Sequence, residues 1–315
     1  MQSLSRAVQA AARISFSHRH VLSAVGSAGA SVSAVAVHAR LAEGEGHRAL
    51  CSSASSAAPP AVGVGVGKGN GAGKGGHLEK EDIVIYQYKI CPFCNKVKAV
   101  MDYLGITYKV TEVNPITKKE IKFSEDYKKV PIMHMAGEAV KDSPVIVEAL
   151  LSRLREAGGM SEEEHAIFCS PDAEKWAKWA DTKLAVLLFP NITRNFSESY
   201  QAFTYVRDVD TFSFVDKASN QQLLGATAMW AAQGKIKKKY GIDDEREALF
   251  KALKEWTDAL EVAPGPFIGG EKPNLGDLCV FGCIAAIEGL DTHQDVLARD
   301  GVGPWYTRMK AVLNY

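Results

Sequence analysis

Hydrophobic residues in the first half of the chain follow two alternating spacings. Residues 83–88 form a continuous apolar and aromatic run, which is typical of a strand covered on both faces of a sheet. Apolar residues then recur at helical spacing from Phe93 to Leu104, and Gly105 stands where such a helix would end. This order predicts a strand that leads directly into a helix.

The alternation continues as far as residue 158. It predicts strands at residues 108–113, from Val130 onward and at 139–140, and helices at 117–123 and from Asp142 to about Arg155. Ser143 is a favourable N-cap residue, and Pro144 suits the first helical position, where a missing N–H costs nothing. Strands that alternate with helices indicate an α/β domain, which we assign to residues 81–158.

Strand signals nearly disappear after Pro171. Apolar positions recur at helical spacing over residues 171–190, 196–207, 220–238 and 243–262. Asn274 and Asp277 resemble a capping box at the start of one more helix, and the small residues Gly276 and Gly282 in that helix suit close packing. We therefore predict an all-helical second domain at residues 159–315.

The first predicted strand ends at the sequence Cys91-Pro92-Phe93-Cys94. Pro92 fits the first turn of the following helix, which places Cys91 at the helix N-terminus. Unpaired amides and the positive end of the helix dipole favour a thiolate there, and we expect Lys89 and Lys96 to add positive charge. Because the thiolate is the nucleophilic form, the motif predicts a reactive Cys91.

The cysteine spacing also bears on metal binding and on core packing. A structural zinc site needs four ligands, and no second Cys or His pair stands near this one, so the motif favours a redox pair or a catalytic thiol. Cys279 and Cys283 stand at positions i and i+4 on an apolar helix, so we expect them to pack in the protein core.

These motifs together resemble the glutaredoxin and glutathione-transferase branch of the thioredoxin fold. The resemblance rests on the cysteine motif after a strand, Val130-Pro131 before a strand, and Asp142-Ser143 at a helix start. It implies an α/β thioredoxin-like (glutaredoxin) N-terminal domain followed by an all-α glutathione-transferase-like C-terminal domain. It also implies a cis Val130-Pro131 peptide that pairs with the cysteinyl part of glutathione, while Ser143 receives the γ-glutamyl carboxylate and Asp142 the ammonium group.

A narrower resemblance, to the family of prostaglandin E synthase type 2, covers about residues 83–305. It is carried by residues 86–94, 112–115, 120–124, 128–132, 269–275 and 304–306. The resemblance implies that Cys91 is the essential catalytic thiol, that Tyr88 donates a hydrogen bond beside it, and that Phe93 shapes the pocket. It implies glutathione as a cofactor held by Cys91, Phe93, Val130, Pro131, Asp142 and Ser143. It adds haem as a second cofactor, with the thiolate of Cys91 or that of glutathione as its iron ligand.

Three functions follow from these resemblances. The first is a glutathione-binding isomerase that converts a lipid endoperoxide, as prostaglandin H is converted to prostaglandin E, through the Cys91 thiolate. The second is a glutathione-dependent thiol–disulfide oxidoreductase in which Cys94 resolves a mixed disulfide on Cys91. The third is a module that binds haem or glutathione without turnover. The apolar substrate is expected between the two domains, and a homodimer is expected.

The head of the chain differs in composition from the rest. Residues 1–80 carry eight Lys or Arg and three Asp or Glu, whereas the remainder carries 29 and 34. Residues 1–42 lack acidic residues and are rich in Ser, Ala and Arg, so we predict a transit segment at 1–50, for the mitochondrion rather than a plastid, and no nucleic-acid partner. The alternative is a membrane anchor at 21–37, which would give peripheral membrane association. The Gly- and Ser-rich residues 51–80 are predicted to be a disordered linker.

Overall fold

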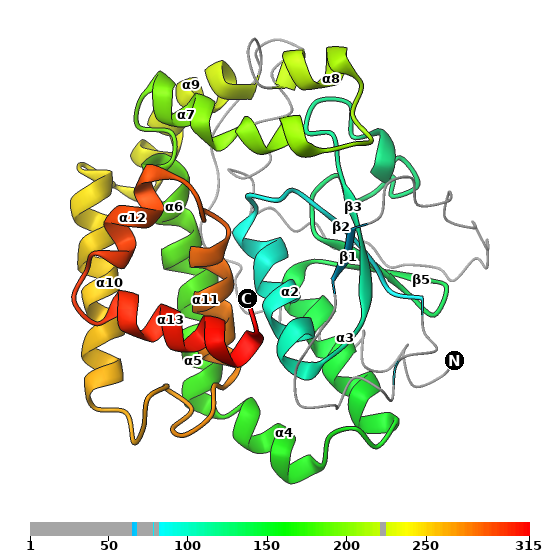
Figure 1. Ribbon diagram of the computed structural model, residues 1–315, viewed down its shortest axis with the longest axis vertical. Coiled ribbons are helices and arrows are strands. Elements are labelled where there is room, and N and C mark those ends of the chain that lie inside the picture. Colours follow the sequence, from blue (N-terminus) through cyan, green and yellow to red (C-terminus); the bar gives the residue numbers. More distant parts are fainter. Residues whose placement is uncertain (1–64, 68–77, 79–81, 221–224) are drawn as a thin grey trace.

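A sheet and a bundle of helices meet along one helix, α2 (Pro92–Leu104). Figure 1 shows the strands on one side of α2 and the helices of the second half on the other. The computed structural model describes residues 65–67, 78, 82–220 and 225–315. A thioredoxin-like domain followed by a helical domain is the predicted fold class, which is thereby confirmed.

The sheet has five strands in the order β1-β3-β2-β4-β5. They are β1 (Gly65–Gly67), β2 (Val84–Gln87), β3 (Tyr108–Glu112), β4 (Ile132–Met135) and β5 (Glu138–Lys141). β2 runs parallel to β3 and antiparallel to β4, and β4 pairs antiparallel with β5. The parallel register places Gln87 opposite Glu112 at the end of the sheet where α2 begins.

The two faces of the sheet have different coverings. On one face Ile85 and Met133 join the main core under α2 and α3 (Ser143–Glu156). The other face carries a smaller apolar cluster, covered by a loop with the short 3-10 helix η4 (Lys119–Ile121). A helix was predicted at residues 117–123, but Lys118 adopts the left-handed conformation with φ of 49°, which confines the helical segment to three residues.

Most of the predicted head lies outside the described residues. This holds for the transit segment at 1–50, for the alternative anchor at 21–37 and for most of the linker at 51–80. Within the linker, residues 65–67 form β1, which pairs antiparallel with the edge of β3, and Leu78 is buried. Short backbone pairing of this kind needs no apolar side chain, so composition alone does not reveal it. Among the described residues, no helix has the length and apolar character needed to cross a membrane.

The second half consists of helices, as predicted. They are α4 (Glu162–Phe168), α5 (Pro171–Trp179), the π-helix η5 (Ala180–Leu184), α6 (Ala185–Asn191), α7 (Phe196–Ala202), the 3-10 helix η6 (Thr204–Asp208), α8 (Phe214–Ala218), α9 (Gly225–Tyr240), α10 (Glu245–Glu261), α11 (Leu275–Ala285), α12 (Asp291–Leu297) and α13 (Val302–Leu313). The predicted helical stretch at 196–207 is divided into α7 and η6, and the Thr204 hydroxyl donates to the Gln201 carbonyl at 2.7 Å where it divides.

The central contact between the domains is that of α2 with α11. The helices approach closely at Gly282, because a Cβ atom there would lie only 2.5 Å from Cα of Lys96. The predicted capping box of α11 is confirmed, since Asn274 and Asp277 each accept from the other's backbone amide at 3.2 Å. Asp277 also accepts from the indole of Trp305 at 3.2 Å, which ties α11 to α13.

Candidate functional site

Cys91 occupies the N-cap of α2, in the position that the sequence predicts. Its backbone is extended, Pro92 follows in the first turn, and the amide of Asn95 donates to the Cys91 carbonyl at 3.0 Å. The Cys91 amide donates to the carbonyl of Tyr88 at 2.9 Å, which closes a tight turn between β2 and α2. The side chain of Cys91 therefore lies at the positive end of a thirteen-residue helix.

The cysteines join several predicted site residues in the smaller apolar cluster. Tyr88, Cys91, Cys94 and Val130 are all buried members of this cluster, and Phe93 packs against it from a half-buried position. Cys94 is fully buried, and its pKa is raised well above that of a free thiol by burial and by a hydrogen bond with Cys91. Cys94 is therefore a neutral thiol behind Cys91.

The hydroxyl of Tyr88 has an unusual environment. It is buried and has no hydrogen-bond partner in the part of the chain that the structure describes. Burial raises the pKa of Tyr88, and Cys91 and Cys94 raise it further to a smaller extent, so the phenol stays protonated. A buried hydroxyl without a partner is costly, and an oxygen atom of a bound molecule would satisfy it.

The predicted glutathione-binding residues lie on two neighbouring segments. The Val130-Pro131 peptide is cis, as the resemblance implies, and Val130 is buried beside the cysteine cluster. Asp142 and Ser143 begin α3, but the prediction that Ser143 is the N-cap is wrong. Asp142 is the N-cap, because its carboxylate accepts from the Ser143 amide at 2.8 Å.

This helix start holds two features that call for an explanation. Asp142 has a φ of 75°, a conformation that is strained for a residue other than glycine. The Ser143 hydroxyl does not cap the helix, and it is buried with no hydrogen-bond partner among the described residues. A strained residue and an unpartnered hydroxyl at a helix N-terminus are suited to an anionic ligand such as a carboxylate.

Three residues near the cysteines were not singled out from sequence. Tyr127, on the loop before Val130, packs against the cysteine cluster. Tyr205, on η6 of the helical domain, has a buried hydroxyl without a partner in the described ranges, and its pKa is raised by burial and by Glu112, Tyr88 and the cysteines. Burial also raises the pKa of Glu112 to about 7.

The segment that carries Tyr205 is attached to the first domain. The side-chain amide of Asn114, two residues after β3, donates to Asp216 of α8 at 2.9 Å. Asn220 donates to the Asn114 side chain at 3.3 Å. No sequence motif marks Tyr205, because its place beside the cysteines depends on this long-range docking. The sequence gives a weak indication that Glu112 lies near the cysteines, because it ends the strand next to the one that leads into the cysteine motif.

The charge that Lys96 was expected to add near Cys91 is engaged in an ion pair. The Lys96 side chain is directed to the helical domain, where its ammonium group donates to both carboxylate oxygens of Asp181 at 2.7 and 2.8 Å. Its side chain is only 3% exposed, so this ion pair lies in the domain interface. Lys89 is exposed on the turn itself. The expected core packing of Cys279 and Cys283 is confirmed, because both thiols are buried in the main core.

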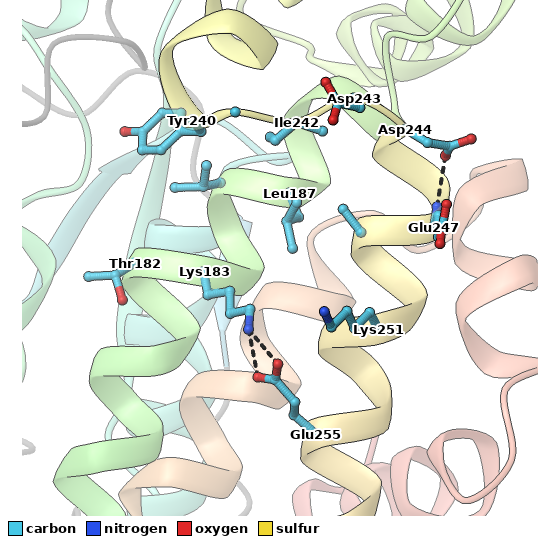
Figure 2. A pocket seen from close by; sticks show the side chains of 13 residues that line it. Thr182, Lys183, Leu187, Tyr240, Ile242, Asp243, Asp244, Glu247, Lys251 and Glu255 are labelled. Atoms are coloured by element: carbon cyan, nitrogen blue, oxygen red, sulfur yellow. Dashed lines mark hydrogen bonds and ion pairs between the residues drawn. The ribbon is translucent and has the colours of Figure 1, made fainter.

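One cavity, of about 470 Å³, lies away from the cysteines in the helical domain. Figure 2 shows it between the helices that carry Thr182, Lys183 and Leu187 and the start of α10, under the connection from Tyr240 to Asp244. Lys183 and Glu255 form an ion pair at 2.6 Å on its wall, and Lys251 lies beside them. The lining mixes charged and apolar residues, comes from the helical domain alone and includes none of the predicted site residues, so this cavity is not the predicted pocket between the domains.

The arrangement around Cys91 does not fit a haem ligand. The Cys91 side chain is 2% exposed and is packed among aromatic side chains. An iron porphyrin needs an open face at its axial ligand, which this closed cluster lacks, so we derive no step through haem.

Comparisons with known proteins agree with this geometry. Residues 85–157 match the family model described as "Glutathione S-transferase, N-terminal domain". The chain is 33% identical over 272 residues to prostaglandin E synthase 2 of Mus musculus, covering 73% of this chain and 70% of the relative. It is 33% identical over 270 residues to prostaglandin E synthase 2 of Danio rerio, with coverage of 72% and 70%.

Solved structures give the same fold. The beta-etherase LigF from Sphingobium sp. strain SYK-6 superposes with a TM-score of 0.51 at 14% sequence identity, over 73% of this chain and 95% of that one. At this level of identity the likeness shows the fold alone.

Proposed function

We propose that this chain, which belongs to the prostaglandin E synthase 2 family, is a glutathione-dependent isomerase that acts on a lipid endoperoxide through Cys91. The relatives and the glutathione transferase family model support a glutathione-related enzyme. One observation carries the finer proposal: the thiol at the N-terminus of α2 lies beside Tyr88, whose buried hydroxyl has no partner within the described residues. Mitochondrial location and a homodimer stay predictions.

Glutathione would lie along the cis Val130-Pro131 segment and the start of α3. Strand-like pairing with the backbone at Val130 suits the cysteinyl part of the tripeptide. The unpartnered hydroxyl of Ser143 and the amides of the first turn of α3 suit its γ-glutamyl carboxylate. Asp142 suits its ammonium group. In this position the glutathione thiol lies near Cys91 and keeps that cysteine reduced.

The isomerisation is redox-neutral and needs one thiolate and one proton donor. The Cys91 thiolate attacks one peroxide oxygen, forming an S–O bond as the O–O bond breaks. The other oxygen leaves as an alkoxide and takes the phenolic proton of Tyr88. The Tyr88 phenolate then removes the hydrogen from the carbon that bears the sulfur-bound oxygen. A carbonyl forms there, the S–O electron pair returns to sulfur, and both residues are regenerated.

The test is turnover of prostaglandin H by the full chain with glutathione, for wild type, Cys91→Ser and Cys94→Ala. We expect Cys91→Ser to lose enzymatic prostaglandin E formation and Cys94→Ala to keep it, because Cys94 takes no part in the isomerisation. Retention of full activity by a folded Cys91→Ser variant would remove the proposal.

A second candidate, thiol–disulfide exchange, is favoured by the hydrogen bond between Cys91 and Cys94. Cys94 is fully buried, so it would resolve a mixed disulfide only from behind Cys91. Its raised pKa makes that attack slow at neutral pH, because the thiolate is the attacking form. Reduction of a glutathionyl mixed disulfide by wild type but not by Cys94→Ala, without any prostaglandin E formation, would establish this candidate instead.

A further inference from the structure

The turn that presents Cys91 is held by two side chains, one from each side. The carboxylate of Glu112, at the end of β3, accepts from the backbone amide of Lys89 at 2.6 Å. The side-chain amide of Asn95, in the first turn of α2, donates to the carbonyls of Lys89 at 2.7 Å and Cys91 at 2.9 Å. The residues between β2 and α2 are therefore fixed to both neighbouring elements.

Glu112 has further fixed contacts that set its orientation. Its second oxygen accepts from the side-chain amide of Gln87 at 3.0 Å, across the parallel pair of β2 and β3. The carboxylate is half-buried, so the hydrogen bonds replace much of the solvation that it would have in water. These two hydrogen bonds hold the carboxylate against the cysteine turn.

We propose that Glu112 is a positioning residue for Cys91, which holds the cysteine turn closed when it is ionised and loosens it when it is protonated. An ionised carboxylate makes a strong, charge-assisted bond to the Lys89 amide. A protonated carboxyl keeps one good acceptor oxygen and loses the charge, so the same bond weakens. This inference rests on the proposed function only for the assignment of Cys91 as the reactive thiol.

The pH range follows from the groups that face Glu112. Burial raises the pKa of Glu112 to about 7, while the Lys89 amide, the Gln87 side chain and the ammonium groups of Lys98 and Lys89 oppose that rise. The phenols of Tyr88 and Tyr205 face it from the turn and from η6, and both stay neutral because their pKa values are raised. Glu112 therefore changes its charge near neutral pH, while the two phenols that face it stay neutral.

The ionised Glu112 slows the reaction of Cys91 through two effects, and both act in the same direction. It holds the turn closed over a buried thiol, and its negative charge disfavours the nearby thiolate. Glu112→Gln keeps an acceptor for the Lys89 amide but stays neutral at every pH, so it imitates the protonated wild type. Glu112→Ala removes the acceptor altogether.

The experiment measures alkylation of Cys91 by iodoacetamide in the full chain between pH 5.5 and 8.5, followed by mass spectrometry of the Cys91 peptide. We expect wild type and Glu112→Gln to react alike below pH 6. Above pH 7 the Gln variant should react about three- to tenfold faster. Glu112→Ala should react about tenfold faster than Glu112→Gln at every pH, because it lacks the hydrogen bond.

Glu164→Gln is the matched control. The Glu164 carboxylate also accepts from a backbone amide, that of Ser161 at 2.9 Å, but it lies on α4 away from the cysteines. In this variant the rate of Cys91 alkylation should follow that of wild type at every pH. A Glu112→Gln to wild-type ratio that stays constant across the pH range would overturn the proposal, even where Glu112→Ala does not fold. The assay needs no lipid substrate, so a protein without isomerase activity still gives a clear answer.

Discussion

The two helices that meet at the domain interface each carry a pair of closely spaced cysteines, and the pairs are equally buried but lie in different surroundings. Cys91 and Cys94 are 2% and 0% exposed at the start of α2, and Cys279 and Cys283 are 1% and 0% exposed in the middle of α11. Exposure alone therefore does not separate a reactive thiol from a structural one. The surroundings separate them.

The α11 pair lies in a closed core. Burial raises the pKa of Cys279 to about 12, and the Cys283 thiol makes a weak contact of 3.8 Å with the carbonyl of Ala180. Cys91, by contrast, stands at a helix N-terminus with the unpartnered hydroxyl of Tyr88 nearby. A thiol at a helix N-terminus beside an unused hydrogen-bond donor is suited to a ligand, whereas the thiols in the middle of α11 are part of the packing of the main core.

The largest expected effect comes from placing serine at one member of each pair. Cys91→Ser should lower prostaglandin E formation by about 10³-fold or more with little change in stability, because it removes the nucleophile. Cys279→Ser should keep the activity and lose about 1–3 kcal/mol of unfolding free energy, because its hydroxyl lies in an apolar core. Turnover and urea unfolding of both variants check this. Equal activity losses would end the distinction between the pairs.

The next effect concerns Lys96, which lies one turn and a half beyond Cys91 on α2. Lys96→Met should cost about 3 kcal/mol of unfolding free energy, because it leaves the Asp181 carboxylate half-buried without its partner. The double variant Lys96→Met/Asp181→Leu should recover most of that loss. A Lys96→Met protein of normal stability with a changed rate of Cys91 alkylation would instead restore the original expectation for Lys96.

Lys96 also shows where reasoning from sequence stops. The strand, the Cys-Pro-Phe-Cys motif and the helix of residues 92–104 could be predicted because their signals are local and consecutive. Which side of α2 Lys96 faces depends on Asp181, 85 residues away. Tyr205 was missed for the same reason, since only the contacts of Asn114 with α8 bring it to the cysteines. The Ser143 N-cap was wrong because the aspartate immediately before it caps the helix one residue earlier, with its carboxylate accepting from the Ser143 amide.

A smaller effect separates hydroxyls with a partner from hydroxyls without one. Tyr88→Phe should lower turnover by about a hundredfold without loss of stability, because its hydroxyl has no partner in the described structure and is proposed to protonate the alkoxide. Tyr108→Phe should leave turnover intact and cost about 1–3 kcal/mol of unfolding free energy, since its hydroxyl donates to the buried Asp102 at 2.9 Å. Loss of stability in Tyr88→Phe without loss of turnover would make Tyr88 a packing residue.

The smallest effect tests whether the two helices influence each other. A methyl group at Gly282 of α11 would meet Cα and N of Lys96 at 2.5 and 2.6 Å, so Gly282→Ala must push α11 away from α2. We expect a loss of about 1–3 kcal/mol of unfolding free energy, as for other overpacked sites. Gly234→Ala is the control, because nothing lies within 4 Å of its added Cβ and alanine favours the helix by about 1 kcal/mol.

Gly282→Ala also tests whether the core reaches the cysteine turn. The same methyl group would lie 2.7 Å from the carbonyl carbon of Asn95, the residue whose side chain holds the carbonyls of Lys89 and Cys91. If the close packing of α11 on α2 fixes that turn, Gly282→Ala should raise the rate of Cys91 alkylation about threefold. That change corresponds to a free energy no larger than that of one hydrogen bond. If the rate is unchanged while stability falls, the turn is held by Glu112 and Asn95 alone, and the two cysteine pairs are independent in spite of their adjoining helices.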